Sequence, residues 1–346
     1  MVVQNMQKGI RTAIFLLVVA AQVGCGSTPA GNQSNNATTP PAVSPTPATD
    51  IELQKQISEI AKDANGKVGV YAVLIETGET VSLNAGERYA MQSVVKLPIS
   101  MAVMSQVNAG KLTLDQKVKI AKNDFVPSNM RSPIRDSNQN GVDLTVEELL
   151  RAAISESDGT AADVLQRVAG GAKGVQTYID SFGIGEMTVK HTHKEFGQKW
   201  ELQYENWATP MGTFNLLMPF FVKPGPIRIG NGMDLIRKFM TESNNPAGRI
   251  VAGLPKGTVV AHKTGTGGTR DGITSATNDV GIITLPNGDH IAIVVFVGDS
   301  SADLATREAV IARITKAIWD RWNRPKSSEN TSGVTQANFS ERHSLY

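Results

Sequence analysis

Apolar residues recur at helical spacing near both ends of the central part of the chain. Residues 51–64 and residues 302–322 each carry their large aliphatic side chains on one helical stripe. This spacing predicts two amphipathic helices, each with one apolar face to bury. We expect the second helix to cover one face of a β-sheet.

Five short apolar runs have the length and composition of strands. Turn residues 76–79 and 286–289 each separate two of these runs, and the second turn predicts a hairpin. The expected strands are residues 68–75, 80–83, 259–262, 281–285 and 291–296. We therefore predict one five-stranded antiparallel sheet to which both ends of the chain contribute.

The residues between these strands carry signals for helix ends. A capping box begins at Thr145, Thr209 precedes a proline at a helix start, and Gly183 follows the end of a helical segment. The predicted fold class is α+β: a five-stranded antiparallel sheet flanked by N- and C-terminal helices, with an inserted all-helical lobe. A crevice between two such lobes is a common place for a small-molecule site.

The N-terminal residues have the features of an export signal. Two basic residues precede an apolar run, residues 13–21, which is too short to span a bilayer but has the length of a signal-peptide core. Residues 1–24 are therefore predicted to be a signal peptide. Cys25 follows Val23 and Gly24, a pattern that resembles the lipobox of bacterial lipoproteins. This resemblance implies a periplasmic protein anchored to the membrane by a lipid on Cys25; plain secretion is the alternative.

Polar segments flank the predicted folded domain. Residues 25–50 are rich in Pro, Ser, Thr, Asn and Ala and are predicted to be a flexible tether, and residues 324–346 are predicted to be a polar C-terminal tail. The catalytic domain is therefore assigned to residues 51–323. Cys25 is the only cysteine, so this domain can form no internal disulfide.

The charge of the chain is almost balanced. There are 34 Lys and Arg residues and 32 Asp and Glu residues, which give a formal net charge of +2 with no long basic run. Such a chain lacks the basic surface that nucleic acids require, so a nucleic-acid partner is not expected.

The segment Ser93-Val-Val-Lys96 is the first candidate for chemistry. Ser93 opens an apolar segment predicted to be helical as far as Val107, and Lys96 lies one turn later on the same face. A lysine held in a dry site loses its proton readily and can accept the proton of the serine, which activates the hydroxyl as a nucleophile. The alternative is a helix-capping serine and a solvated lysine.

The segment Ser157-Asp158-Gly159 falls in a break between two predicted helices. The Ser157 hydroxyl can project into the crevice and pass a proton to a leaving nitrogen, while Asp158 supports the loop. A simple N-cap turn is the alternative, because Ser and Asp are common at that position.

The segment Lys263-Thr264-Gly265-Thr266 follows the expected strand 259–262. Its cation, hydroxyl groups and exposed backbone N–H groups suit a substrate that carries a carboxylate. The N–H groups of Thr266 and Ser93 are candidates for an oxyanion hole. A flexible glycine-rich turn is the alternative.

Together these motifs make the segment from Ile51 to Trp322 resemble the class A β-lactamases. Residues 91–97, 203–207, 261–266 and 275–279 are close to the wording of the extended-spectrum branch of that family. The resemblance implies that Ser93 is acylated, that Lys96 and Ser157 move protons, and that Lys263 and Thr264 hold the substrate carboxylate. Gly265, Thr266 and Asp158 complete the expected substrate-binding set, and Arg270 is a further candidate for anchoring the carboxylate.

Two positions depart from the family pattern. Gly159 stands where the family has an asparagine that contacts the substrate. Counting back from Gln203-Tyr204 puts His193 where the family has the glutamate that holds the deacylating water, and Glu195 lies two residues away. Either His193 or Glu195 is then the general base, or deacylation is slow; an exposed polar loop is the alternative for both residues.

The resemblance implies a monomeric serine β-lactamase that hydrolyses β-lactam antibiotics through an acyl-enzyme on Ser93, with no cofactor and no metal. The pair His191 and His193 suggests zinc only weakly, because no third ligand stands nearby. A penicillin-binding sensor or trap with slow deacylation and a D-Ala-D-Ala peptidase, which shares the motifs, are the alternative functions.

Overall fold

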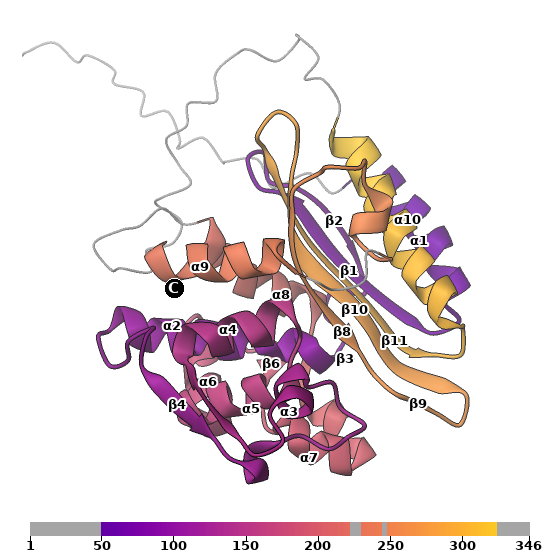
Figure 1. Cartoon of the computed structure of the whole chain (residues 1–346). Helices are drawn as coiled ribbons and strands as arrows, with labels where there is room; N and C mark the ends of the chain where they lie inside the picture. The colour runs from indigo at the N-terminus through magenta and orange to yellow at the C-terminus, as the bar shows by residue number, and fades with distance from the viewer. Residues whose placement is uncertain (1–49, 222–229, 244–247, 324–346) are drawn as a thin grey trace, which may run out of the picture. The chain divides into compact units, whose positions relative to one another are not determined.

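A six-stranded antiparallel sheet organises the computed structural model, which describes residues 50–221, 230–243 and 248–323 (Figure 1). The strands follow the order β2-β1-β11-β10-β8, and the short β9 pairs with β10. Their bounds are β1 (Lys67–Leu74), β2 (Glu79–Leu83), β8 (Val260–Thr266), β9 (Thr269–Arg270), β10 (Ile273–Thr284) and β11 (His290–Ser300). The predicted α+β class is confirmed: the five expected strands form the main path of the sheet, and β9 is an addition.

Both faces of the sheet are buried. Helices α1 (Ile51–Ala61), continued by the 3₁₀ turn η1 (Lys62–Ala64), and α10 (Leu304–Trp322) cover one face (Figure 1). Alternate residues of β11 point into two separate cores, Ile293 into the core under α1 and α10 and Val294 into the core of the helical lobe. Burial on both sides explains why this strand is a continuous apolar run in the sequence.

The helical lobe is inserted between β2 and β8. Helix α2 (Lys96–Asn108) is buried from Lys96 to Met104 and packs against α4, α5, α6 and α9. A helix that is apolar on all sides needs such neighbours on every side. The other helices are α3 (Pro133–Ser137), α4 (Val146–Ser155), α5 (Gly159–Val168), α6 (Gly171–Asp180), α7 (His193–Gln198), α8 (Pro210–Leu217) and α9 (Gly230–Thr241).

Short elements connect these helices. Strands β3 (Tyr89–Ala90), β7 (Trp207–Ala208) and β6 (Met187–Thr188) form a small sheet, and β4 (Lys117–Ile120) pairs with β5 (Val142–Thr145). The remaining 3₁₀ turns are η2 (Gln92–Val95), η3 (Lys122–Asp124), η4 (Trp200–Glu205), η5 (Met218–Phe220) and η6 (Val251–Gly253).

The capping signals mark the helix starts correctly. Thr145 and Glu148 form the predicted reciprocal capping box of α4, and the Thr209 hydroxyl accepts a hydrogen bond from Gly212 N at the start of α8. Asp50, which the sequence assigned to the tether, caps α1 by accepting a hydrogen bond from Leu53 N at 3.1 Å. Asp50 is therefore part of the folded segment and not of the tether.

Three strands extend several residues beyond the predicted bounds: β8, β10 and β11, which runs from His290 to Ser300 where 291–296 was expected. We expected strand 259–262 to end before Lys263 and strand 281–285 to begin at Gly281, but β8 continues to Thr266 and β10 starts at Ile273. Strands β8 and β10 pair through these extra residues, from Lys263 opposite Val280 to Thr266 opposite Thr277. Because these residues have polar side chains, the sequence pattern does not mark them as strand residues. In the structure they form a ladder of hydrogen bonds that satisfies the backbone groups.

The predicted signal peptide 1–24, residues 25–49 of the predicted tether and the predicted tail 324–346 lie outside the described residues. Within the described ranges, none of the helices is both long and apolar enough to cross a membrane.

Arg249 connects strands β8 and β10 to α10. Its guanidinium is almost completely buried and donates to the carbonyl oxygens of Gly265 (3.1 Å) and Asn278 (2.8 Å). It also donates to Thr266 Oγ1 at 2.7 Å and pairs with Glu308 of α10 at 3.1 Å. One buried cation thus fixes the end of β8 against β10.

We expect Arg249→Met to lower the free energy of unfolding by about 3–5 kcal/mol, because it leaves the Glu308 carboxylate and two buried carbonyl groups without their donor. Urea unfolding followed by circular dichroism measures this loss. Arg313→Met is the matched control: its ion pair with Asp63 is about half exposed on both sides, so its loss should cost under about 1 kcal/mol. Equal losses in the two variants would contradict the prediction.

Candidate functional site

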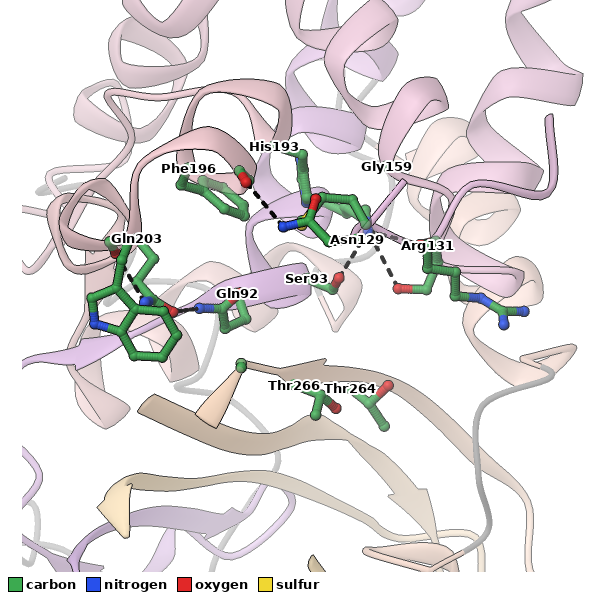
Figure 2. A pocket seen from close by; sticks show the side chains of 17 residues that line it. Gln92, Ser93, Asn129, Arg131, Gly159, His193, Phe196, Gln203, Thr264 and Thr266 are labelled. Carbon is green, nitrogen blue, oxygen red and sulfur yellow. Dashed lines mark hydrogen bonds between the residues drawn. The ribbon is translucent and has the colours of Figure 1, made fainter. Parts of the chain in front are cut away.

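A cavity of about 560 Å³ lies between the helical lobe and β8. Figure 2 shows Ser93 and His193 on the helical side and Thr264 and Thr266 on the strand that faces them. The lining includes the sequence-predicted residues Ser93, Lys96, Ser157, Gly159, His193, Thr264 and Thr266. Three motifs that are far apart in the chain therefore meet around one space.

Ser93 lies in η2, one turn before α2. The sequence predicted that Ser93 itself opens the helix, but the 3₁₀ turn comes first and α2 begins at Lys96. Gln92, the residue before Ser93, has a φ of 50°, a left-handed conformation that is uncommon for a residue with a side chain. Lys96 Nζ donates a hydrogen bond of 2.8 Å to Ser93 Oγ. The turn thus presents the hydroxyl to the amine.

The Lys96 amine is buried, with 1% of the residue exposed. Its other partners belong to Ser157: the carbonyl oxygen at 2.8 Å and Oγ at 3.4 Å. Burial lowers the pKa of Lys96 to about 7, against the attraction of Asp158 and Asp163. A large fraction of this amine is therefore neutral near pH 7 and able to accept a proton.

Ser157 lies between two lysines. Its Oγ accepts a hydrogen bond from Lys263 Nζ at 3.0 Å and lies near Lys96 Nζ. Lys263 is fully buried, and burial followed by repulsion from Lys96 lowers its pKa well below the usual value. Ser157 has a φ of 58°, so the loop between α4 and α5 holds it in an uncommon conformation. This chain of groups can carry a proton across the site.

Asp158 lies behind the cavity, not in its lining. Its fully buried carboxylate caps α5 through Ala161 N at 2.8 Å and also accepts hydrogen bonds from Ile134 N at 2.7 Å and Ser132 Oγ at 3.1 Å. These contacts join α3 to the loop that carries Ser157. Asp158 therefore supports the loop, and the structure does not bring it to the substrate side.

Gly265 allows β8 to approach η2. A Cβ atom at this position would lie 2.6 Å from the carbonyl oxygen of Met91, so only glycine fits without a shift of backbone. The close approach puts Ser93 and Thr266 on the same cavity. Arg270 lies elsewhere: its half-exposed side chain pairs with Glu201 at 3.0 Å, and it does not line the cavity.

His193 is buried at the cavity wall, with 1% of the residue exposed. Its Nδ1 lies 3.0 Å from Asp163 Oδ1, whereas its Nε2 has no hydrogen-bond partner among the described residues. Burial, followed by the charge of Lys96, lowers the pKa of His193 to about 4. The imidazole is therefore neutral near pH 7.

Glu195, the other candidate base, lies outside the cavity. Its exposed carboxylate completes a capping box at the start of α7 and accepts hydrogen bonds from Thr192 N at 2.7 Å and Thr192 Oγ1 at 2.8 Å. Among the described residues that line the cavity, none is an aspartate or a glutamate.

Gly159 contributes backbone to the cavity wall. Its N–H donates to the carbonyl oxygen of Arg131 at 2.9 Å, as Figure 2 shows. A Cβ atom here would lie 3.1 Å from that same oxygen and 3.3 Å from Val126, which is tight. Gly159 therefore leaves only backbone at this part of the wall, and a side chain here would have to displace its neighbours.

Several lining residues carried no signal in the sequence. Asn129 and Arg131 come from a loop before α3, and Trp200 comes from η4. Only the tertiary fold brings Asn129, Arg131 and Trp200 to the cavity, so no local pattern could have found them. Gln92, which donates to Gln203 at 2.5 Å (Figure 2), lies with Gln203 in segments that the resemblance had already singled out. Among the described residues, no group of three or more His, Cys, Asp or Glu side chains could hold a metal ion.

A family model and individual relatives of known sequence all identify the same family. Residues 52–322 match the model of the β-lactamase enzyme family. The chain is 37% identical to β-lactamase VEB-1 from Pseudomonas aeruginosa over 268 residues, which is 78% of this chain and 89% of that protein. It is also 37% identical to the extended-spectrum β-lactamase PER-1 from the same organism, over 77% of this chain and 86% of that protein.

A solved structure supports the same grouping. The crystal structure of a β-lactamase from Chitinophaga pinensis superposes with a TM-score of 0.75 at 41% identity. The match covers 78% of this chain and 99% of that chain.

Proposed function

The chain belongs to the β-lactamase enzyme family and is a class A serine β-lactamase, and on this premise we propose that Ser93 carries the acyl group and that His193 activates the water that removes it. β-Lactam antibiotics are the substrates. The observation that carries the proposal is the buried, neutral imidazole at the wall of a cavity whose described lining has no carboxylate.

Acylation begins with the neutral Lys96 amine. It accepts the proton of Ser93 Oγ, 2.8 Å away, while Oγ attacks the carbonyl carbon of the β-lactam ring. The backbone N–H groups of Ser93 and Thr266 stabilise the negative charge that develops on the carbonyl oxygen. Ser157, between Lys96 and Lys263, donates a proton to the ring nitrogen as the C–N bond breaks.

Substrate binding uses the β8 side of the cavity. The hydroxyl groups of Thr264 and Thr266 line it, and Lys263 lies directly behind them. A substrate carboxylate beside Lys263 would favour the charged form of that amine, which burial otherwise disfavours. Gly265 contributes by its small size and Asp158 by holding the Ser157 loop, whereas Arg270 pairs with Glu201 outside the lining and has no role in the proposal.

Deacylation requires a base that faces the acyl group. His193 fits this requirement best, because it lines the cavity and its buried Nε2 has no hydrogen-bond partner among the described side chains and backbone. Glu195 does not, because its carboxylate is exposed and occupied by the cap of α7. The cavity lining without a carboxylate also favours one second candidate function, a penicillin-binding trap that acylates and releases its product slowly.

We also propose that the protein is exported to the periplasm and anchored by a lipid on Cys25. The support is the sequence alone: a basic start, an apolar run of signal-peptide length and the lone cysteine directly after it. The polar segment that follows gives the catalytic domain reach from the membrane.

A chromogenic cephalosporin together with intact-protein mass spectrometry tests the base. We expect steady turnover with little adduct in the wild type and in Glu195→Ala. In His193→Ala we expect one rapid equivalent of product and a lasting adduct on Ser93, with deacylation slowed about 10²- to 10⁴-fold. Unchanged turnover in His193→Ala would exclude His193 as the base, and a wild type that stops after one equivalent would support the trap.

The pH dependence of acylation tests Lys96. Only the neutral amine accepts the serine proton, so the acylation rate should rise with pH, reach half its maximum near the Lys96 pKa of about 7, and level off above it. An ordinary lysine would be neutral at pH 7 in only about one molecule in 3000. Stopped-flow single-turnover measurements in the His193→Ala variant isolate this step. A rate that is flat or falls between pH 5 and pH 8 would contradict the role of Lys96.

Labelling with radioactive palmitate tests the anchor. Cells that express the wild type should yield labelled protein in the membrane fraction, whereas Cys25→Ser should yield unlabelled protein, because the chain has no other cysteine. A matched Ser27→Ala variant should be labelled like the wild type. Unlabelled wild type in the soluble periplasmic fraction would instead support plain secretion.

A further inference from the structure

Asp163 connects α5 to the first turn of α7. Its largely buried carboxylate accepts hydrogen bonds from His193 N at 2.7 Å and Lys194 N at 2.8 Å. The same oxygen that binds His193 N lies 3.0 Å from His193 Nδ1. One carboxylate thus holds both the backbone and the ring of His193.

These contacts define which ring nitrogen carries the proton. An ionised carboxylate can only accept hydrogen bonds, so Nδ1 must be the donor. A neutral imidazole has one proton on its ring nitrogens, and therefore Nε2 keeps its lone pair. Nε2 is the buried atom that no described residue contacts through a hydrogen bond. Since His193 lines the cavity, this lone pair is the one left to bind a water molecule there.

The surroundings of the ring keep it neutral and in place. Lys96 of α2 and Lys263 of β8 are the cations that act on it, and Asp163 is the anion. The Phe196 ring packs against the imidazole with 4.9 Å between ring centroids. The ring therefore has little freedom to turn, and its orientation depends on Asp163.

We propose that Asp163 is a positioning residue that selects the Nδ1–H tautomer of His193, so that the pair Asp163–His193 activates the deacylating water in place of a glutamate. The inference rests on the proposed role of His193 as the base. Selecting a tautomer by a buried carboxylate is a known way to prepare a histidine for proton transfer.

The proposed step balances in protons and bonds. The water oxygen forms a bond to the acyl carbon while Nε2 takes one of its protons, which leaves an imidazolium ion and a tetrahedral oxyanion. The oxyanion collapses, the bond from the acyl carbon to Ser93 Oγ breaks, and the proton on Nε2 returns to Oγ. Asp163 stays ionised throughout and stabilises the imidazolium ion.

Asp163→Asn removes the selection of the tautomer. The asparagine oxygen can still accept one backbone hydrogen bond, but its NH₂ group can face Nδ1 and so move the ring proton to Nε2. We expect deacylation to slow by about 10²- to 10⁴-fold while the acylation rate changes far less, so the Ser93 adduct accumulates. Single-turnover kinetics with a chromogenic cephalosporin separate the two rates.

Nitrogen NMR of protein labelled with ¹⁵N-histidine gives a readout that a purely structural role would not change. In the wild type, His193, assigned by comparison with His193→Ala, should show protonated Nδ1 and unprotonated Nε2; in Asp163→Asn the two should exchange. Protonated Nε2 in the wild type overturns the proposal, even if the variant fails to fold.

Thr192→Ala is the matched control. It removes the cap that orders the same turn of α7, and the hydroxyl it deletes is hydrogen-bonded to Glu195, not to His193 or Asp163. If Thr192→Ala slows deacylation as much as Asp163→Asn does and the tautomer is unchanged in both, the order of the loop explains the effect and the proposal fails. If Asp163→Asn deacylates normally while His193→Ala does not, the base assignment survives and the role of Asp163 fails. Normal deacylation in His193→Ala contradicts the base assignment itself.

Discussion

Burial of the Lys96 amine is the constraint on which the rest of the site depends. The amine stands at the start of a helix that is buried all round, and it reaches the oxygen atoms of Ser93 and Ser157. An ammonium ion there would lose its hydration, and the attraction of Asp158 and Asp163 offsets this loss only in part. The pKa of Lys96 therefore falls. The buried core of the helical lobe thus supplies a proton acceptor that an exposed lysine would not be.

The sequence was enough to predict the fold wherever one physical signal dominated. Helical spacing marked α1 and α10, and capping residues marked the starts of α4 and α8. The extent of β8 and β10 was not predictable, because polar residues such as Lys263 and Thr277 occupy strand positions that the opposite strand and the helical lobe bury. Burial of polar groups is a tertiary property, and the pattern of single residues does not contain it.

The site was predictable in part for the same reason. Local motifs brought out Ser93, Ser157 and Thr264, each of which has a neighbour in its own motif that also lines the cavity. Asp163 has no such neighbour: it acts on His193, 30 residues away, through a contact between α5 and α7. Counting back from a landmark located His193 but could not choose between it and Glu195; our proposal of His193 rests on its burial and on the capping box that engages Glu195.

The exchange of a glutamate for a histidine also affects Lys96. Lys96 and a charged His193 repel each other, so a charged imidazole would disfavour the charged form of Lys96. A carboxylate at the same position would favour the charged form of Lys96. A neutral imidazole does neither directly. The negative charge of the pair lies on Asp163, on the Nδ1 side of the ring. It attracts Lys96 from farther away than a carboxylate in the cavity wall would. With the charge on Asp163 and not in the cavity wall, one site can hold both of the neutral bases that we propose, the Lys96 amine for acylation and the His193 imidazole for deacylation.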